Sequence, residues 1–213
     1  MIPVASAWDA WSPTVVAKRM TEVGAPWCIV GGWALDLFRG GPTRPHDDVE
    51  VAVPAERFAE IEACFPDCDF YVPHDGELLP ATAETLISDF QTWALERAAG
   101  RWRFDVFREP HDGDTWIYRR DTRLRRPYAE IIRRSADGIP YLTPEIVLLF
   151  KAKDVRGKDQ ADFEGTLPLL DAAQRQWLGD ALVTVHPGHI WASLVFSSCN
   201  QKVRLVATAS TGA

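Results

Sequence analysis

The sequence is poor in cysteine, with four residues in a chain of 213. Neither this number nor the spacing of Cys28, Cys64, Cys68 and Cys199 suits a dense disulfide framework or a four-ligand zinc site. Cys64 and Cys68 are close enough in sequence to bind metal or oxidise, but no second pair accompanies them. We therefore expect reduced thiols with a structural role.

Long hydrophobic runs are also missing. No stretch reaches the roughly 18 apolar residues of a membrane span, and the N-terminus lacks a basic region followed by a long apolar core. With 46% hydrophobic and 25% charged residues, the chain has the composition of a soluble globular protein that buries a core as one domain or two small lobes. We expect a cytoplasmic protein without a membrane partner.

Positive charge is in deficit, since 23 basic residues face 30 acidic ones and the formal net charge is −7. This balance argues against a dedicated nucleic-acid binder and favours encounter with a cationic small molecule. The one concentrated basic stretch, residues 119–126, has no interleaved aromatic residues. We interpret it as a solvated loop and strand edge rather than a patch for nucleic acid.

Capping and turn signals divide the first part of the chain into short helices and strands. Ser12-Pro13 is typical of a helix start and Gly24 of a stop, so a helix is predicted over residues 13–23. Further helices are predicted at 33–38 and 54–65; strands at 27–30, 48–53, 69–72 and 102–107; and a hairpin of 131–134 with 139–142.

From Thr143 onward the pattern becomes helical, with a break at Gly157 and helical segments to about residue 182. We predict an α+β fold, in which a mixed sheet of about five strands is flanked by helices and followed by a helical C-terminal lobe. The predicted divisions are a catalytic domain at 1–142, the helical lobe at 143–196 and a flexible tail at 197–213.

Two acidic residues stand at the start of the valine-rich strand. Residues two apart on a strand share a face and lie about 7 Å apart, so Asp48 and Glu50 project together while Val49, Val51 and Val53 face the core. Like charges this close are unfavourable unless a cation lies between them. Carboxylate oxygens suit Mg²⁺ or Mn²⁺, and the pair therefore predicts a metal site.

A third carboxylate follows the same alternating pattern. Asp105 lies between Phe104 and Val106 on a predicted strand, from which it would join the first two acids if the strands are neighbours. Three acids are enough to hold two ions. The alternative is a strand-end acid in a structural ion pair with Arg101 or Arg103.

The pair Gly31-Gly32 lies between a predicted strand and a predicted helix. Glycine at such a junction lets the backbone approach a phosphate group, and the following helix presents free N–H groups at the positive end of its dipole. Taken alone, the pair equally fits a tight turn.

The order of these features resembles the nucleotidyltransferase superfamily that includes DNA polymerase β. The segment "CIVGGWALDLFRGGPTRPHDDVEVAV" is similar to the aminoglycoside 2″-adenylyltransferase group, with lincosamide nucleotidyltransferases as nearby relatives. The resemblance runs from about Trp27 to Leu194, because "YLTPEIVLLFKAKDVRGKDQADFEGTLPLL" and "HPGHIW" also look like the helical half of that group.

The resemblance implies a nucleotidyltransferase fold and assigns roles by position. The paired metal acids of the family fall on Asp48 and Glu50, its third acid on Asp105, and its glycine motif on Gly31 and Gly32. Two departures are modest: Glu50 stands where many members have aspartate, and Gly32 stands where much of the superfamily has serine. Neither change forbids catalysis.

The implied activity is transfer of AMP from ATP to a hydroxyl group of a small molecule, most often an aminoglycoside, with two Mg²⁺ ions as cofactors. Asp48 and Glu50 would stay ionised as metal ligands, while Asp105 would take the proton of the hydroxyl group. The alternatives are a lincosamide or other small-molecule acceptor, a protein or RNA acceptor, and a non-catalytic partner of a toxin.

Three further residues are candidates for contact with the nucleotide or with the acidic loop. Arg44 is expected to reach a phosphate group. Lys151, beside the break between two predicted helices, is expected to meet the triphosphate, and its alternative is a solvated helix face. His46 fits the family's His-x-Asp pattern, and we expect it to orient the acidic loop through a hydrogen bond to a loop carbonyl.

A cationic acceptor also needs carboxylates beyond those that hold metal. The candidates lie near the predicted site elements: Glu84, Asp89, Glu130 and Asp162. Each is equally compatible with an ordinary exposed acid.

Overall fold

The structure is a computed structural model that describes residues 5–197. The chain divides into two compact units, Met1–Leu142 and Thr143–Ala213, which are described separately below. The predicted flexible tail lies, apart from its first residue, outside the described residues. Within residues 5–197 no helix is both long enough and apolar enough to cross a lipid bilayer.

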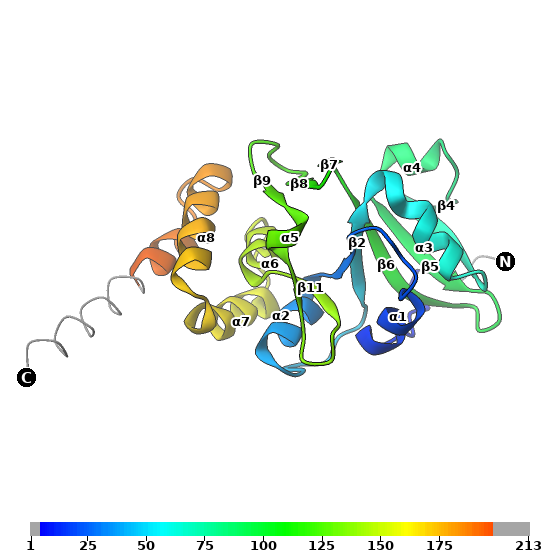
Figure 1. Ribbon diagram of the computed structural model, residues 1–213, viewed down its shortest axis with the longest axis horizontal. Coiled ribbons are helices and arrows are strands. Elements are labelled where there is room, and N and C mark those ends of the chain that lie inside the picture. The colour runs from blue at the N-terminus through cyan, green and yellow to red at the C-terminus, as the bar shows by residue number, and fades with distance from the viewer. Residues whose placement is uncertain (1–4, 198–213) are drawn as a thin grey trace, which may run out of the picture. The chain divides into compact units, whose positions relative to one another are not determined.

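A mixed sheet forms the centre of the first unit (Figure 1). Among residues 5–142 it has eight strands, of which the pairs β1–β11 and β2–β6 are parallel and the others antiparallel. The strands in spatial order are β10 (Ile132–Arg134), β11 (Pro140–Leu142), β1 (Cys28–Ile29), β2 (Glu50–Pro54), β6 (Arg101–Glu109), β5 (Gln91–Glu96), β3 (Cys68–His74) and β4 (Glu77–Pro80). The mixed sheet is confirmed.

The prediction of about five strands was too low. Ranges had been predicted for six strands of this sheet, and β4 and β5 were missed. In the sequence of β5, QTWALE, polar and apolar residues do not alternate regularly, and several of the residues favour helices. Its place in the sheet is fixed by pairing on both sides, with β3 and with β6. Tertiary pairing therefore overrides local propensity at this strand.

Short helices connect these strands. They are α1 (Pro13–Arg19), α2 (Gly31–Arg39), α3 (Phe58–Cys64) after a 3₁₀ turn at Ala55–Arg57, α4 (Thr85–Ser88) and α5 (Tyr128–Ile131). The predicted start of α1 is confirmed, since the Ser12 hydroxyl accepts a hydrogen bond from the Val15 N–H at 3.3 Å. The predicted end at residue 23 was wrong, because the helix stops at Arg19, where Met20 leaves the helical conformation.

A second, small sheet follows β6 along the chain. It consists of β7 (His111–Asp112), β8 (Thr115–Ile117) and β9 (Arg125–Pro127), in that order, and no residue range was predicted for any of them. Two or three residues are too few to show a period in the sequence. The basic stretch thus contributes an edge strand, β9, as was expected of part of it.

Residues 104–109 of β6 alternate between the two faces of the large sheet. Phe104 and Val106 are fully buried, and the Phe104 ring lies 4.5 Å from the Phe65 ring beyond α3. The intervening residues, Asp105 and Phe107, point to the opposite face. Over residues 104–109, β6 therefore faces the hydrophobic core with Phe104 and Val106 and carries a carboxylate on its other side.

The second unit is helical, as predicted. Its elements are α6 (Pro144–Lys151), α7 (Gly157–Thr166), a 3₁₀ turn at Leu167–Leu169, α8 (Ala172–Val185) and a further helical stretch at 190–197. Pro144 takes the first helical position of α6, and a capping box of Asp171 and Gln174 starts α8. Gly157, predicted as a break, is the first residue of α7.

Candidate active site

Two of the predicted metal acids lie side by side on neighbouring strands. Strands β2 and β6 are parallel, and Glu50 is the direct register partner of Asp105. The backbone fixes this pairing, because the Asp105 N–H donates to the Val49 carbonyl at 2.9 Å. Adjacent strands are about 4.8 Å apart, so the two carboxylates leave the sheet next to each other.

Asp48 lies just outside the strand on which it was predicted. β2 begins at Glu50, two residues later, where its register pairing with β6 begins. Asp48 is exposed, and its backbone carbonyl accepts a hydrogen bond from the Trp33 indole N–H at 3.1 Å. The structure places it near Asp105 all the same, since both residues line one pocket.

Asp105 is buried, with a relative exposure of 3%. The side-chain amide of Gln91 donates to its Oδ2 atom, whereas Oδ1 has no hydrogen-bond partner. Burial, and after it the charge of Glu50, raise the pKa of Asp105 well above its usual range. The alternative of a pair with Arg103 was wrong, because Arg103 binds Glu96 at 2.7 Å and also Asp9.

The donor set suits a divalent cation without forming a closed cage. No group of three His, Cys, Asp or Glu residues within 5–197 is arranged to hold a metal ion by itself. However, Asp105 Oδ1 is a buried oxygen without a partner beside the Glu50 carboxylate. Mg²⁺ is commonly held by one or two carboxylates together with substrate phosphates and water, and Glu50 and Asp105 fit that mode.

Gly31 and Gly32 begin α2 and allow a close approach that any side chain would block. Gly31 has a φ of +62°, and a Cβ atom added to it would overlap the Glu50 carboxylate. A Cβ on Gly32 would lie 2.6 Å from His46 Cε1 and also too close to the Arg44 guanidinium. The serine of other superfamily members would therefore require both side chains to move.

His46 is held by a partner that the sequence reasoning missed. Its Nε2 atom lies 2.6 Å from Oδ2 of Asp36, and both side chains are buried. Its ring stacks on Trp33 with a centroid distance of 4.3 Å. The contact fits the expected orienting role, although the partner is a carboxylate on α2 rather than a loop carbonyl.

Asp36 organises the loop between α2 and β2. Its Oδ1 atom accepts a hydrogen bond from the Thr43 hydroxyl at 2.6 Å. Burial by itself would raise the pKa of Asp36, but the hydrogen bonds from Thr43 and His46 outweigh it and the pKa falls below its usual range. The sequence feature that could have revealed this role is an acid between Leu35 and Leu37 on an apolar helix face.

A pocket of about 490 Å³ opens beside the acids. Its lining residues are Ser6, Trp8, Asp47, Asp48, Gln91, Trp93 and Asp105. Trp8 and Trp93 meet edge to face at 5.2 Å, and Trp93 continues to Trp102 at 5.5 Å. The pocket thus joins carboxylates to an aromatic wall, a combination that attracts cationic groups.

A β-bulge supports the aromatic wall. The pairing of β5 with β6 shifts between Ala94 and Leu95, so that Leu95 is opposite Trp102 instead of Arg103. One extra residue on β6 turns Trp102 to the same face as Asp105. Trp102 is fully buried there and supports Trp93.

The acids proposed for the acceptor do not line this pocket; Asp47, which was not singled out, does. Glu84 is exposed at the start of α4, and the backbone carbonyl of Asp89 accepts from Arg108 at 2.6 Å. Glu130 lies 3.5 Å from Arg126. Their roles as acceptor contacts stay predictions.

The expectation of a solvated loop was wrong for Arg119 of the basic stretch. Arg119 is only 15% exposed, pairs with Glu109, and lies over the Phe90 and Phe107 rings at 4.1 and 5.0 Å. Arg123, at 70% side-chain exposure, is solvated as expected. The local sequence did not show which of the two arginines is buried, because the residues that cover Arg119 come from other elements.

Lys151 belongs to the second unit, where its ammonium lies 2.7 Å from Asp159 and 3.1 Å from Asp162. The side chain is 9% exposed, so the alternative of a solvated helix face was wrong. Its proposed contact with a triphosphate stays a prediction. Asp162, a candidate for the acceptor, is likewise in this buried ion cluster.

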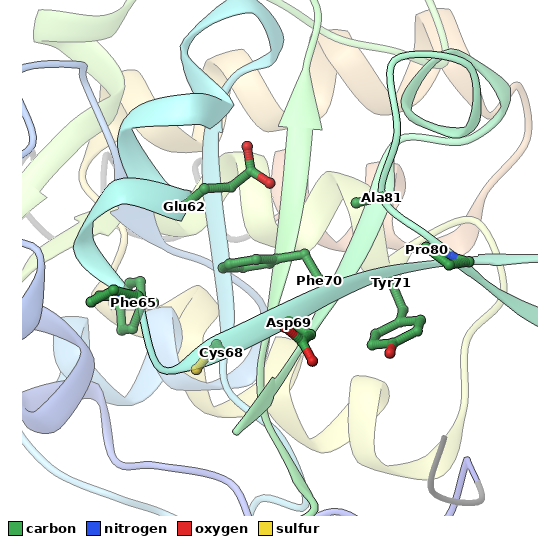
Figure 2. Close-up of a pocket in the computed structure, with 9 residues that line it drawn as sticks. Glu62, Phe65, Cys68, Asp69, Phe70, Tyr71, Pro80 and Ala81 are labelled. Carbon is green, nitrogen blue, oxygen red and sulfur yellow. The ribbon is translucent and has the colours of Figure 1, made fainter. Parts of the chain in front are cut away.

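A different pocket, of about 350 Å³, lies between α3 and β3 and contains none of the predicted site residues. Figure 2 shows Glu62 projecting from α3 and Asp69 and Tyr71 projecting from β3. It has neither a glycine turn nor neighbouring strand acids. The pocket beside Asp105 is therefore the stronger candidate.

The free thiols agree with the expectation from composition. Cys28, Cys64 and Cys68 form no disulfide, and Cys199 lies outside the described residues. Burial, followed by the charge of Asp67, raises the pKa of Cys68 to about 12. A thiol with such a pKa is a poor nucleophile at neutral pH.

Part of the chain is similar to a known protein family. The family model "Aminoglycoside-2″-adenylyltransferase" matches residues 14–80. Proteins named 2″-aminoglycoside nucleotidyltransferase from Escherichia coli and Klebsiella pneumoniae are each 48% identical over 58 residues, which is 26% of this chain. The match spans about a third of the length of these relatives, 33% in each case.

Two solved structures align at lower identity. A crystal structure of ANT(2″)-Ia in complex with adenylyl-2″-tobramycin is 14% identical, covers 90% of this chain and 98% of its own, and has a TM-score of 0.45. The lincomycin-bound lincosamide antibiotic adenylyltransferase LnuA is 16% identical, covers 65% of this chain and 83% of its own, and has a TM-score of 0.45.

Proposed function

From the premise that residues 14–80 carry the sequence of the aminoglycoside 2″-adenylyltransferase family, we propose that this protein is a metal-dependent adenylyltransferase. It transfers AMP from ATP to a hydroxyl group of a small molecule, with an aminoglycoside as the first choice. The observation that carries the proposal is the register pairing of Glu50 with Asp105 on parallel strands, next to the backbone of Gly31.

Glu50, Asp105 and Asp48 would hold Mg²⁺, with Mn²⁺ as a substitute and a second ion in the complete complex. The metal would neutralise charge on the phosphate oxygens and on the leaving pyrophosphate. Gly31 and Gly32 let the first turn of α2 approach those phosphates, with backbone N–H groups and the helix dipole favouring an anion. Arg44, which lies beside Gly32, would add a cationic contact to the phosphates.

Asp105 is proposed as the general base. The oxygen of the acceptor hydroxyl forms a bond to the α-phosphorus of ATP, the bond to the bridging oxygen breaks, and pyrophosphate leaves. The proton of the hydroxyl passes to the Asp105 carboxylate, whose Oδ2 atom is fixed by Gln91 and whose Oδ1 atom has no partner. A raised pKa makes a carboxylate a better proton acceptor near neutral pH.

The acceptor would bind in the pocket lined by Asp47, Asp48, Trp8 and Trp93. Ammonium groups of an aminoglycoside suit the carboxylates and the indole faces. The aromatic wall also leaves room for a second candidate, a lincosamide acceptor. The intact acids argue against a non-catalytic partner of a toxin.

The test is a matrix of the four nucleoside triphosphates against aminoglycosides and lincosamides, with pyrophosphate release and the mass of the product as readouts. The proposal expects release only with ATP and an acceptor, together with an AMP adduct of that acceptor. Asp48→Asn is the comparison variant, for which a lower rate is expected. Release of pyrophosphate without an adduct, or no adduct in any combination, would refute the proposal.

A further inference from the structure

On the first unit, Arg119 contacts two aromatic rings and a buried carboxylate. Its guanidinium lies over the rings of Phe90 and Phe107, at 4.1 and 5.0 Å from their centroids. It also pairs with Glu109, whose side chain is only 5% exposed. A cation stacked on two rings and paired with a buried carboxylate loses little conformational freedom when it meets a ligand.

The sheet places this cation beside the candidate active site. Phe107 is two residues from Asp105, on the same face of β6 and about 7 Å along the strand. Phe107 is also the register partner of Gln91, which donates to the Asp105 carboxylate. Arg119 therefore covers the sheet position next to the Gln91–Asp105 contact.

Electrostatics support this proximity. Burial lowers the pKa of Arg119, whereas the negative charges of Glu109 and, more weakly, of Glu50 act to raise it. Glu50 is the register neighbour of Asp105. The cation of Arg119 thus acts within the electrostatic range of the acids proposed to hold metal.

We propose that Arg119 binds the phosphate groups of the nucleotide and stabilises the leaving pyrophosphate; this inference rests on the proposed function. A guanidinium has five N–H donors in a planar fork, so a contact with Glu109 is compatible with simultaneous binding of phosphate oxygens. The polyphosphate carries more negative charge than a bound metal removes, and a fixed cation beside it offsets the remainder.

A structural role alone would also require Arg119, because its loss would leave Glu109 buried without its cation. The variant must therefore remove both charges. Glu109→Gln with Arg119→Met keeps side chains of similar size and leaves no buried, unpaired charge. Arg119→Lys is the second variant, since it keeps the charge and the Glu109 pair but loses the planar fork.

The matched control is Arg19. Its guanidinium lies over the rings of Trp11 and Phe65, at 4.7 and 4.5 Å, and pairs with Asp67. Phe65 packs against Phe104, on the face of β6 opposite to Asp105. The double variant Arg19→Met with Asp67→Asn removes the same kind of pair away from the acids.

The experiment titrates the full chain with inorganic pyrophosphate and with ATP, both in the presence of Mg²⁺, by calorimetry. We expect the Glu109/Arg119 double variant to bind each ligand on the order of 10- to 100-fold more weakly, as for a charged hydrogen bond. Arg119→Lys should lie in between, and the Arg19/Asp67 control should match the wild type. In steady-state kinetics, the Glu109/Arg119 double variant should have a higher KM for ATP and an unaltered KM for the acceptor.

Equal affinities of the wild type and both Arg119 variants would overturn the inference while leaving the proposed function intact. Equal losses in the Arg119 variant and in the Arg19 control would also overturn it, because they would indicate a general effect of lost stability. If the wild type binds neither ligand, the proposed function itself fails and the inference fails with it.

Discussion

The two faces of strand β6 have opposite chemistry, although they come from adjacent residues. One face presents Phe104 and Val106 to the hydrophobic core, where both are fully buried. The other presents Asp105, Phe107 and Glu109, of which the two acids are buried as well. The difference teaches that burial on the first face stabilises the fold, whereas burial on the second face raises the pKa of its acids.

The two stacked arginines repeat this contrast. Arg19 and Arg119 each lie over two aromatic rings and pair with one carboxylate. Arg19 is near residues of the core face, and Arg119 is near the acids of the other face. Similar local contacts therefore serve either stability or ligand binding, depending on which side of the sheet they occupy.

The largest effect is expected from Asp105→Asn. An amide cannot take a proton, so turnover should fall by about 10²- to 10⁴-fold, the usual contribution of a general base. Nucleotide binding should survive, because Glu50 and the glycine turn remain. The measurement is steady-state kinetics with the acceptor found in the substrate matrix, together with calorimetry of ATP binding.

Asp9→Asn is the control for this variant, since Asp9 is an exposed acid that pairs with Arg103 near the start of β6. It should keep the rate of the wild type. Near-normal turnover of Asp105→Asn would remove Asp105 from the mechanism.

On the core face, Phe104→Ala should lower the free energy of unfolding by about 3–5 kcal/mol, as for other large-to-small changes at buried aromatic residues. Phe107→Ala on the acidic face should lower the free energy of unfolding by less, because Phe107 is only half-buried. Denaturant unfolding followed by tryptophan fluorescence measures both. A larger loss for Phe107 would contradict the assignment of the core to one face.

Asp48→Asn tests the exposed member of the acid set. We expect weaker binding of ATP with Mg²⁺ by about tenfold or more, because a charged ligand of the metal is lost, and a matching fall in turnover. Calorimetry with and without Mg²⁺ separates the part of ATP binding that depends on the metal from the part that does not. Unchanged affinity and turnover would exclude Asp48 from the site.

The smallest effect concerns stability and pH in metal-free protein. Because the folded-state pKa of Asp105 is raised, its contribution to stability is present below the unfolded pKa of about 4 and lost as pH rises through the folded value. Asp105→Asn should therefore have the higher Tm at neutral pH, and this advantage should vanish toward pH 4.

Asp67→Asn should change the Tm in the opposite direction: at neutral pH it should have a lower Tm than the wild type, and this difference should vanish in acid. The hydrogen bond from Arg19 lowers the pKa of Asp67, so its contribution is present above the unfolded pKa and lost in acid. Thermal scans of both variants from pH 2 to 8 in EDTA provide the comparison, because the Asp67 contribution is lost only below about pH 4. A Tm of Asp105→Asn below that of the wild type at pH 8 would show that the buried acid does not destabilise the fold.

Structural features that depend on a few neighbouring residues were predictable from the sequence. The cap at Ser12-Pro13, the glycine turn, the hairpin around Asp137-Gly138 and the helices after Thr143 depend on neighbouring residues, and the structure has them where they were expected. The resemblance of the segment around Gly31 and Asp48 was also confirmed by the family match. Roles of individual residues stay predictions.

By itself the sequence determined which residue types alternate along β2 and β6 and where the glycine turn lies, because strand period and backbone freedom are local properties. Only the tertiary structure decided that Glu50 is beside Asp105, that Gln91 on an unpredicted strand holds that acid, and that Arg119 is buried over Phe107. These contacts join residues 12 to 55 positions apart in sequence, and which strands become neighbours depends on the packing of the whole sheet.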